Sequence, residues 1–204
     1  MNRRTFTQNS AAAAMATAAG RMNAGQTAGG TGRPNVLFIA LDDLNHWVRH
    51  LGRNPQVITP NLDRLARRGT TFTRAYCAAP VCNPSWAAVM SGLRPATTGC
   101  YDNATDWRPL VSEELTMPSQ FRRHGYFVAG AGKLYHGGFD RDSAFDEYMK
   151  RGGGPDPKPK GSDGVGGIKF ALLDCRDDDL VDYRITDWCI SQLQRKQPKP
   201  FGGS

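Results

Sequence analysis

The chain has 204 residues, of which 39% are hydrophobic and 22% charged, a balance typical of a globular protein that excludes wholesale disorder. No stretch of ~18 or more apolar residues occurs, so we expect no transmembrane helix. The formal net charge of +7 includes Arg3, Arg4 and Arg21, and the other basic residues are scattered, so we expect no nucleic-acid partner. Five irregularly spaced cysteines contain no Cys-x-x-Cys motif, which argues against a zinc ribbon.

The first 32 residues are typical of an export signal followed by a linker. Arg3 and Arg4 precede a run of small residues from Ser10 to Ala19. This is the layout of a twin-arginine signal, which predicts export to the periplasm or the extracellular space. A disordered tail rich in Ala and Gly is the alternative. We expect the folded domain over residues 33–204.

The first half of that domain alternates between strand and helix patterns. Residues 35–41 are apolar almost without interruption, which predicts a central parallel strand covered on both faces. Thr59 and Pro60 predict a helix start, and Gly69 predicts its end. Residues 71–76 alternate as a second strand, and Pro84 opens a short helix that ends at Ser91-Gly92.

The second half repeats this alternation. Residues 118–125 predict a helix, 126–131 a strand, 151–167 a loop, and 179–196 a further helix. The apolar residues spaced for the buried face of the last helix are Val181, Ile185, Trp188 and Leu193. Strand and helix in alternation predict an α/β fold with a mixed, mostly parallel central sheet flanked by helices.

Three clusters of reactive side chains lie at predicted strand ends or at a helix start. Asp42 and Asp43 follow the first strand, where paired carboxylates suit a hard cation such as calcium, although a solvated loop is the alternative. Cys82 begins a short helix, a position that stabilises an anion, although an inert buried cysteine would look the same. Lys133 and His136 follow another strand and offer a positive charge and a proton-transfer group.

Several ordered motifs resemble the type I sulfatases, members of the alkaline phosphatase superfamily. These motifs are residues 33–44, 59–69, 82–85 and 91–95. Two further segments, 97–103 and 132–136, are most similar to the iduronate-2-sulfatase branch. The similarity runs from about residue 33 to 201 and identifies 33–204 as the N-terminal, incomplete part of a sulfatase catalytic domain.

The resemblance implies roles for the same five residues. Cys82 matches the cysteine that a formylglycine-generating enzyme oxidises, and the hydrated aldehyde supplies the nucleophile. Asp42 and Asp43, together with the modified Cys82, match ligands of a calcium ion that polarises the sulfate oxygens. Lys133 matches a sulfate-binding lysine and His136 a partner of the nucleophile. The implied substrates are sulfate esters of sulfated sugars or glycosaminoglycans.

Two features depart from the family pattern. The signature Cys-x-Pro-Ser-Arg has Trp86 in place of the arginine, and an indole has neither its charge nor its five donors. The sequence also stops after Phe201, where relatives continue into another core strand and further metal ligands. We therefore expect this chain to be inactive. A non-catalytic remnant or binding module, and a phosphoester or phosphonate hydrolase of the same superfamily, are the alternatives.

Overall fold

The computed structural model describes residues 32–150, 164–165, 168–169, 173–197 and 199–203. The chain divides into two units, Met1–Arg33 and Pro34–Ser204, and all elements below belong to the second. The predicted export signal lies outside the described residues. Among the described residues, no helix has the length and apolar character needed to cross a membrane.

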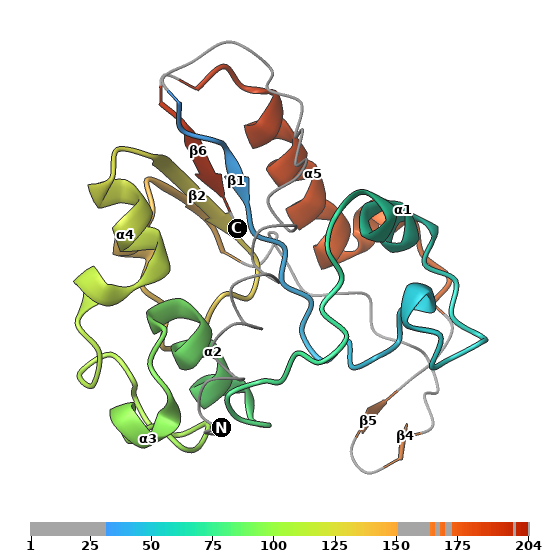
Figure 1. Ribbon diagram of the computed structural model, residues 1–204, viewed down its shortest axis with the longest axis horizontal. Coiled ribbons are helices and arrows are strands. Elements are labelled where there is room, and N and C mark those ends of the chain that lie inside the picture. Colours follow the sequence, from blue (N-terminus) through green and yellow to red (C-terminus); the bar gives the residue numbers. More distant parts are fainter. Residues whose placement is uncertain (1–31, 151–163, 166–167, 170–172, 198, 204) are drawn as a thin grey trace, which may run out of the picture. The chain divides into compact units, whose positions relative to one another are not determined.

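A four-stranded parallel sheet forms the centre of this unit (Figure 1). Its strands, in spatial order, are β1 (Val36–Leu37), β6 (Phe201–Gly203), β2 (Phe127–Ala131) and β3 (Glu147–Met149). The register pairs Val36 with Gly202 and Phe127 with Phe201. The predicted α/β class with a mostly parallel sheet is therefore confirmed.

Two helices cover the opposite faces of this sheet. Phe121 of α4 (Met117–Arg123) packs on the face that includes Val128 of β2, whereas α5 (Val181–Gln194) packs on the face that includes Ala129. Neighbouring residues of one strand point to opposite faces, so β2 needs apolar residues at every position. This explains the uninterrupted apolar run that predicted the strand at 126–131.

The first predicted strand is shorter and more exposed than expected. β1 comprises only Val36 and Leu37, with one further hydrogen bond from the Phe38 N–H to the Gly203 carbonyl oxygen (2.7 Å). Leu37, Ile39 and Leu41 are 49%, 67% and 55% exposed. The prediction of a strand buried on both faces is wrong here because β1 is at the edge of the sheet, with no strand on its other side among the described residues. A continuous apolar run cannot distinguish an edge strand from a central one.

Helix boundaries agree with the predictions to within a few residues. The capping residues of α1 (Pro60–Arg68) are Thr59 and Gly69, as predicted, but no residue of α1 is buried. The short helix α2 (Cys82–Ser91) begins two residues earlier than predicted and ends at Gly92, which has φ 72°. Among the described residues, the short helical segments are α3 (Pro95–Thr98), η1 (Arg49–Leu51), η2 (Glu113–Leu115), η3 (Asp142–Ala144) and η5 (Asp177–Asp179).

Three local predictions need correction. Residues 71–76 form no strand, and Phe72 and Tyr76 are 78% and 87% exposed. On α5, Leu193 is exposed, and the neighbouring Gln192 is buried because its amide donates a hydrogen bond to Glu147. Of the loop predicted over 151–167, Gly164–Val165 form β4, which pairs antiparallel with β5 (Ile168–Lys169), and the rest lies outside the described residues.

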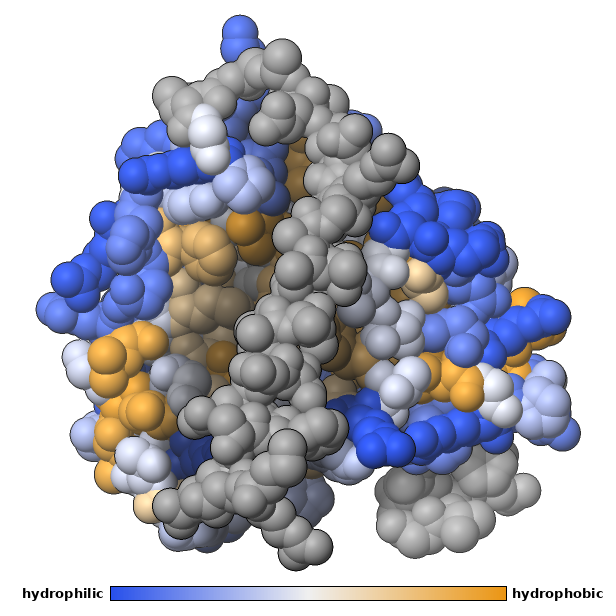
Figure 2. Space-filling model, viewed as in Figure 1, coloured by the Kyte–Doolittle hydropathy of each residue, from blue (hydrophilic) through white to orange (hydrophobic). Residues whose placement is uncertain are grey.

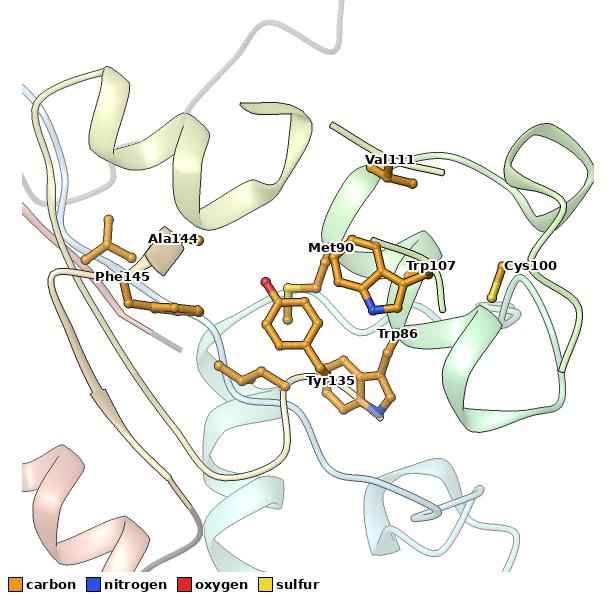
Figure 3. Packing of buried hydrophobic residues seen from close by; sticks show 11 residues of the cluster. Trp86, Met90, Cys100, Trp107, Val111, Tyr135, Ala144 and Phe145 are labelled. Atoms are coloured by element: carbon orange, nitrogen blue, oxygen red, sulfur yellow. The ribbon is translucent and has the colours of Figure 1, made fainter. Parts of the chain in front are cut away.

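The hydrophobic core joins α2 to the segments that follow it and to the loop after β2. Its aromatic centre is a stack of Trp107 on Tyr135, with ring centroids 5.3 Å apart, and Trp86 and Met90 of α2 belong to the same cluster (Figure 3). On the visible surface, hydrophilic residues occupy most of the margin, but several hydrophobic residues are exposed between them (Figure 2). The core thus fixes α2 relative to the sheet and leaves other apolar residues open to solvent.

Candidate functional site

Asp42 and Lys133 are far apart in the sequence and form an ion pair at the carboxyl edge of the sheet. Asp42 follows β1 and Lys133 follows β2, 91 residues later. Because the strands are parallel, their carboxyl ends meet at one edge. Burial lowers the pKa of Lys133, but the hydrogen bond to Asp42 and the charges of Asp42, Cys82 and Asp43 together outweigh it and hold this pKa above its usual value. The site therefore contains a positively charged ammonium group, that of Lys133.

Asp42, Asp43 and Cys82 converge beside this cation. One ligand atom from each lies within 4.8 Å of the other two. The turn that presents the carboxylates has left-handed backbone at Asp43 (φ 54°) and Asn45 (φ 58°), which aspartate and asparagine tolerate better than other side chains. Two carboxylates held this close favour a bound cation, and calcium takes oxygen ligands of this kind. The two carboxylates fit calcium in kind and supply part of its coordination shell, whereas the sulfur of an unmodified Cys82 does not fit this ion.

Cys82 is the first residue of α2 and is half-buried. The N-cap residue, Val81, has no side-chain acceptor for the first N–H groups of the helix. The N–H of Asn83 instead donates to Oδ1 of Asn103 at 2.9 Å, and Pro84 has no N–H. The start of α2 is therefore capped by a side chain from a distant loop.

An open cleft of about 830 Å³ contains the cluster. Besides Asp42, Asp43 and Cys82, it is lined by Asn45 and His46, which sequence reasoning did not single out. The signal available for both was their position two and three residues after Asp43. A second cleft, of about 890 Å³ between Arg108 and Lys150, includes none of the predicted site residues. The reactive side chains therefore favour the first cleft.

His136 follows Lys133 by three residues, and neither residue is among those that line the cleft. Lys133 is joined to the cleft by its ion pair with Asp42. Nδ1 of His136 is buried and has no hydrogen-bond partner among the described residues. A buried nitrogen without a partner is unusual, and water or a ligand hydroxyl would satisfy it. The role predicted for His136 stays a prediction.

Trp86 lies one helical turn after Cys82 and is 8% exposed. Its side chain packs in the core cluster with Met90 and Tyr135, and part of it lines the cleft (Figure 3). The bulk of the indole does not disturb the start of the helix, because α2 is helical from Cys82 onward. The consequence of tryptophan here is chemical: the position supplies packing and no positive charge.

The family model for sulfatases matches residues 34–201 of the chain. A sulfatase of Formosa agariphila is 36% identical over 190 residues, covering 83% of this chain and 37% of that protein. The choline-sulfatase of Rhizobium meliloti is 36% identical over 119 residues (58% and 23%), and the human iduronate 2-sulfatase is 35% identical over 112 residues (55% and 20%). The chain belongs to the sulfatase family. It spans between a fifth and two fifths of the length of these relatives.

Proposed function

We propose that the chain carries part of the catalytic site of a sulfuric ester hydrolase, a class that acts on sulfated sugars or glycosaminoglycans, in an exported protein. The observation that supports this most directly is the convergence of Asp42, Asp43, Cys82 and Lys133 at one edge of a parallel sheet. The relatives named as iduronate 2-sulfatase and choline-sulfatase agree with a sulfate ester as substrate. A phosphoester hydrolase is less well supported, because Cys82 takes the place of a Ser or Thr nucleophile.

In this proposal the chain's own residues bind and orient the sulfate group. The ammonium of Lys133 pairs with an anionic sulfate oxygen, and its ion pair with Asp42 fixes where that charge lies. Asp42 and Asp43 would hold a calcium ion, which would supply electrostatic polarisation of the sulfate oxygens. A formylglycine at position 82, made from Cys82 by a formylglycine-generating enzyme, would supply the nucleophilic hydroxyl. His136 would exchange a proton at its unpartnered Nδ1.

Trp86 makes us propose that this chain is inactive as a sulfatase, with a non-catalytic binding module as the alternative function. The family's arginine at this position serves recognition by the modifying enzyme and orients the formylglycine hydroxyl. The buried indole supplies neither charge nor more than one donor. Because Trp86 packs in the core, the fold accommodates tryptophan at this position, whereas formylglycine formation and its orientation would lose the arginine that they need.

The test is mass spectrometry of the peptide that contains Cys82, after production of the full chain together with a formylglycine-generating enzyme. We expect the wild type to keep its thiol and the Trp86→Arg variant to carry the aldehyde. Conversion of the wild type would overturn the role given to Trp86. Failure of both proteins to convert would count against Cys82 as a modification site.

A second measurement addresses the metal. Calcium binding, followed by titration calorimetry, is expected to weaken at least tenfold in Asp43→Asn, because calcium affinity depends on the number of charged ligands. Asp63→Asn in α1 is the matched control, since Asp63 does not line the cleft. Equal affinities of the two variants would contradict the assignment.

A further inference from the structure

The side-chain amide nitrogen of Asn83, the residue after Cys82, is fully bonded, whereas its Oδ1 is buried without a partner among the described residues. Asn83 as a whole is fully buried. Its Nδ2 donates to the carbonyl oxygens of Asp102 (2.9 Å) and Thr105 (2.7 Å) and lies 3.4 Å from Sγ of Cys100. This set of acceptors fixes the orientation of the amide, because a flipped amide would place its oxygen against two carbonyls.

The partner loop, residues 100–105, is held in shape by its own hydrogen bonds. Oδ1 of Asp102 accepts from the N–H groups of Ala104 (3.0 Å) and Thr105 (2.8 Å) and from the Thr105 hydroxyl (2.7 Å). These three bonds lower the pKa of Asp102, and the bond from the Thr105 hydroxyl contributes most to the shift. The conformation of the 100–105 loop is therefore fixed by hydrogen bonds within the loop itself.

The loop and α2 are joined in both directions. Asn83 donates from its side chain to the loop backbone, and the loop returns the side chain of Asn103 as acceptor for the Asn83 backbone N–H. Val81 provides no side-chain cap, so the bond to Asn103 satisfies an otherwise free N–H of the first turn of α2, and it adds to the backbone bond from the Ser85 N–H to the Val81 carbonyl oxygen (3.1 Å). Cys82 precedes Asn83 directly, so its thiol lies where this closed turn places it.

We propose that Asn83 and Asn103 are positioning residues that hold Cys82 against Asp42 and Asp43 by capping α2 from the 100–105 loop. A catalytic role for this positioning rests on the proposed function, because a nucleophile must lie within a small distance of the reacting group. Its structural content, that the Asn103 acceptor fixes the accessibility of Cys82, stands on the hydrogen bonds alone.

The experiment compares Asn103→Leu with Asn103→Asp in the full chain, produced without formylglycine-generating enzyme so that Cys82 stays a thiol. Asn103 is exposed, so both variants keep the buried contacts of Asn83. Leucine has a similar size but no acceptor, whereas aspartate keeps an oxygen for the Asn83 N–H. Iodoacetamide alkylation of Cys82 is timed by mass spectrometry against the exposed Cys77 as the internal reference.

We expect the Cys82-to-Cys77 rate ratio to rise about fivefold in Asn103→Leu, the factor that corresponds to one lost neutral hydrogen bond, and to stay at the wild-type value in Asn103→Asp. An unchanged ratio in Asn103→Leu overturns the inference. A change of both thiols together also overturns it, because that indicates general loosening. If Asn103→Leu does not fold, Asn103→Ala gives the same comparison. The ratio does not depend on sulfate ester hydrolysis, so it can fail or succeed independently of the proposed function.

Discussion

Tyr135 and Tyr148 lie close in the structure but differ in how their hydroxyl groups are bonded. The hydroxyl of Tyr148 donates to the carbonyl oxygen of Gly132 at 2.8 Å, whereas that of Tyr135 is buried and has no partner among the described residues. An unpaired buried hydroxyl has lost its water without compensation. We expect Tyr135→Phe to leave the free energy of unfolding unchanged or raised, and Tyr148→Phe to lower it by about 1 kcal/mol, measured by urea unfolding at pH 7. A larger loss in Tyr135→Phe would contradict this.

The same two tyrosines predict how stability changes at alkaline pH. Burial raises the pKa of each above its usual value, with nearby charges adding to the effect. Between the unfolded pKa of about 10 and the raised folded pKa, the unfolded state loses protons that the folded state keeps, so stability falls as pH rises. Relative to wild type, Tyr135→Phe should reduce this fall by up to about 1.4 kcal/mol per pH unit. Denaturant unfolding at several pH values between 7 and 11 measures the slope, and equal slopes would contradict the prediction.

At the scale of elements, β2 and the segment before β3 approach so closely that only glycine fits between them. A methyl group added at Gly130 would lie 2.6 Å from Cε1 of the buried Phe145. We expect Gly130→Ala to lower the free energy of unfolding by about 1–3 kcal/mol through overpacking. Gly137→Ala is the matched control because nothing lies within 4 Å of its added methyl. Thermal unfolding of both variants tests the difference, which should be absent if Phe145 can move aside.

Elements with local signals could be predicted from the sequence, and elements made by distant partners could not. Proline and glycine mark the ends of α1, and glycine also ends α2, because these signals depend on the backbone of neighbouring residues. The alternating residues 71–76 lacked a neighbouring strand and formed none. Conversely, Phe201-Gly202-Gly203 has little strand character, yet β1 and β2 on either side make it a strand.

The candidate site shows the same limit. Asp42, Asp43, Cys82 and Lys133 could be singled out because each follows a strand or begins a helix, and the fold then brings them to one edge. The cap from Asn103 to Asn83 could not be found, because it joins residues 20 positions apart through a loop of no regular structure. The residue types at the ends of strands and helices can be read from the sequence. Which distant side chain caps such an end depends on the conformation of a loop, and that cannot be read from the sequence.

At the scale of the whole unit, a number of large apolar side chains are exposed to solvent. The exposed residues include Leu37, Ile39, Leu41, Phe72 and Tyr76. We expect concentration-dependent self-association, seen by light scattering after size exclusion. Ile39→Lys should reduce it without lowering the melting temperature, since Ile39 is 67% exposed. Gln56→Lys adds the same charge at an exposed polar position and should leave association unchanged. Equal effects of both variants would indicate a response to net charge only.

The position of β6 also determines when the sheet can form during synthesis. β6 lies between β1 and β2, and the bond from the Phe201 N–H to Oδ1 of Asn35 joins residues 166 positions apart. β1 cannot be joined to β2 and β3 until residues 201–203, which form β6 between them, have left the ribosome. Contacts of such long range slow folding, and a nascent chain that lacks them exposes two open strand edges. The emerging chain therefore depends on residues 201–203 to close the sheet, and a chaperone that shields β1 during this interval would protect it from aggregation.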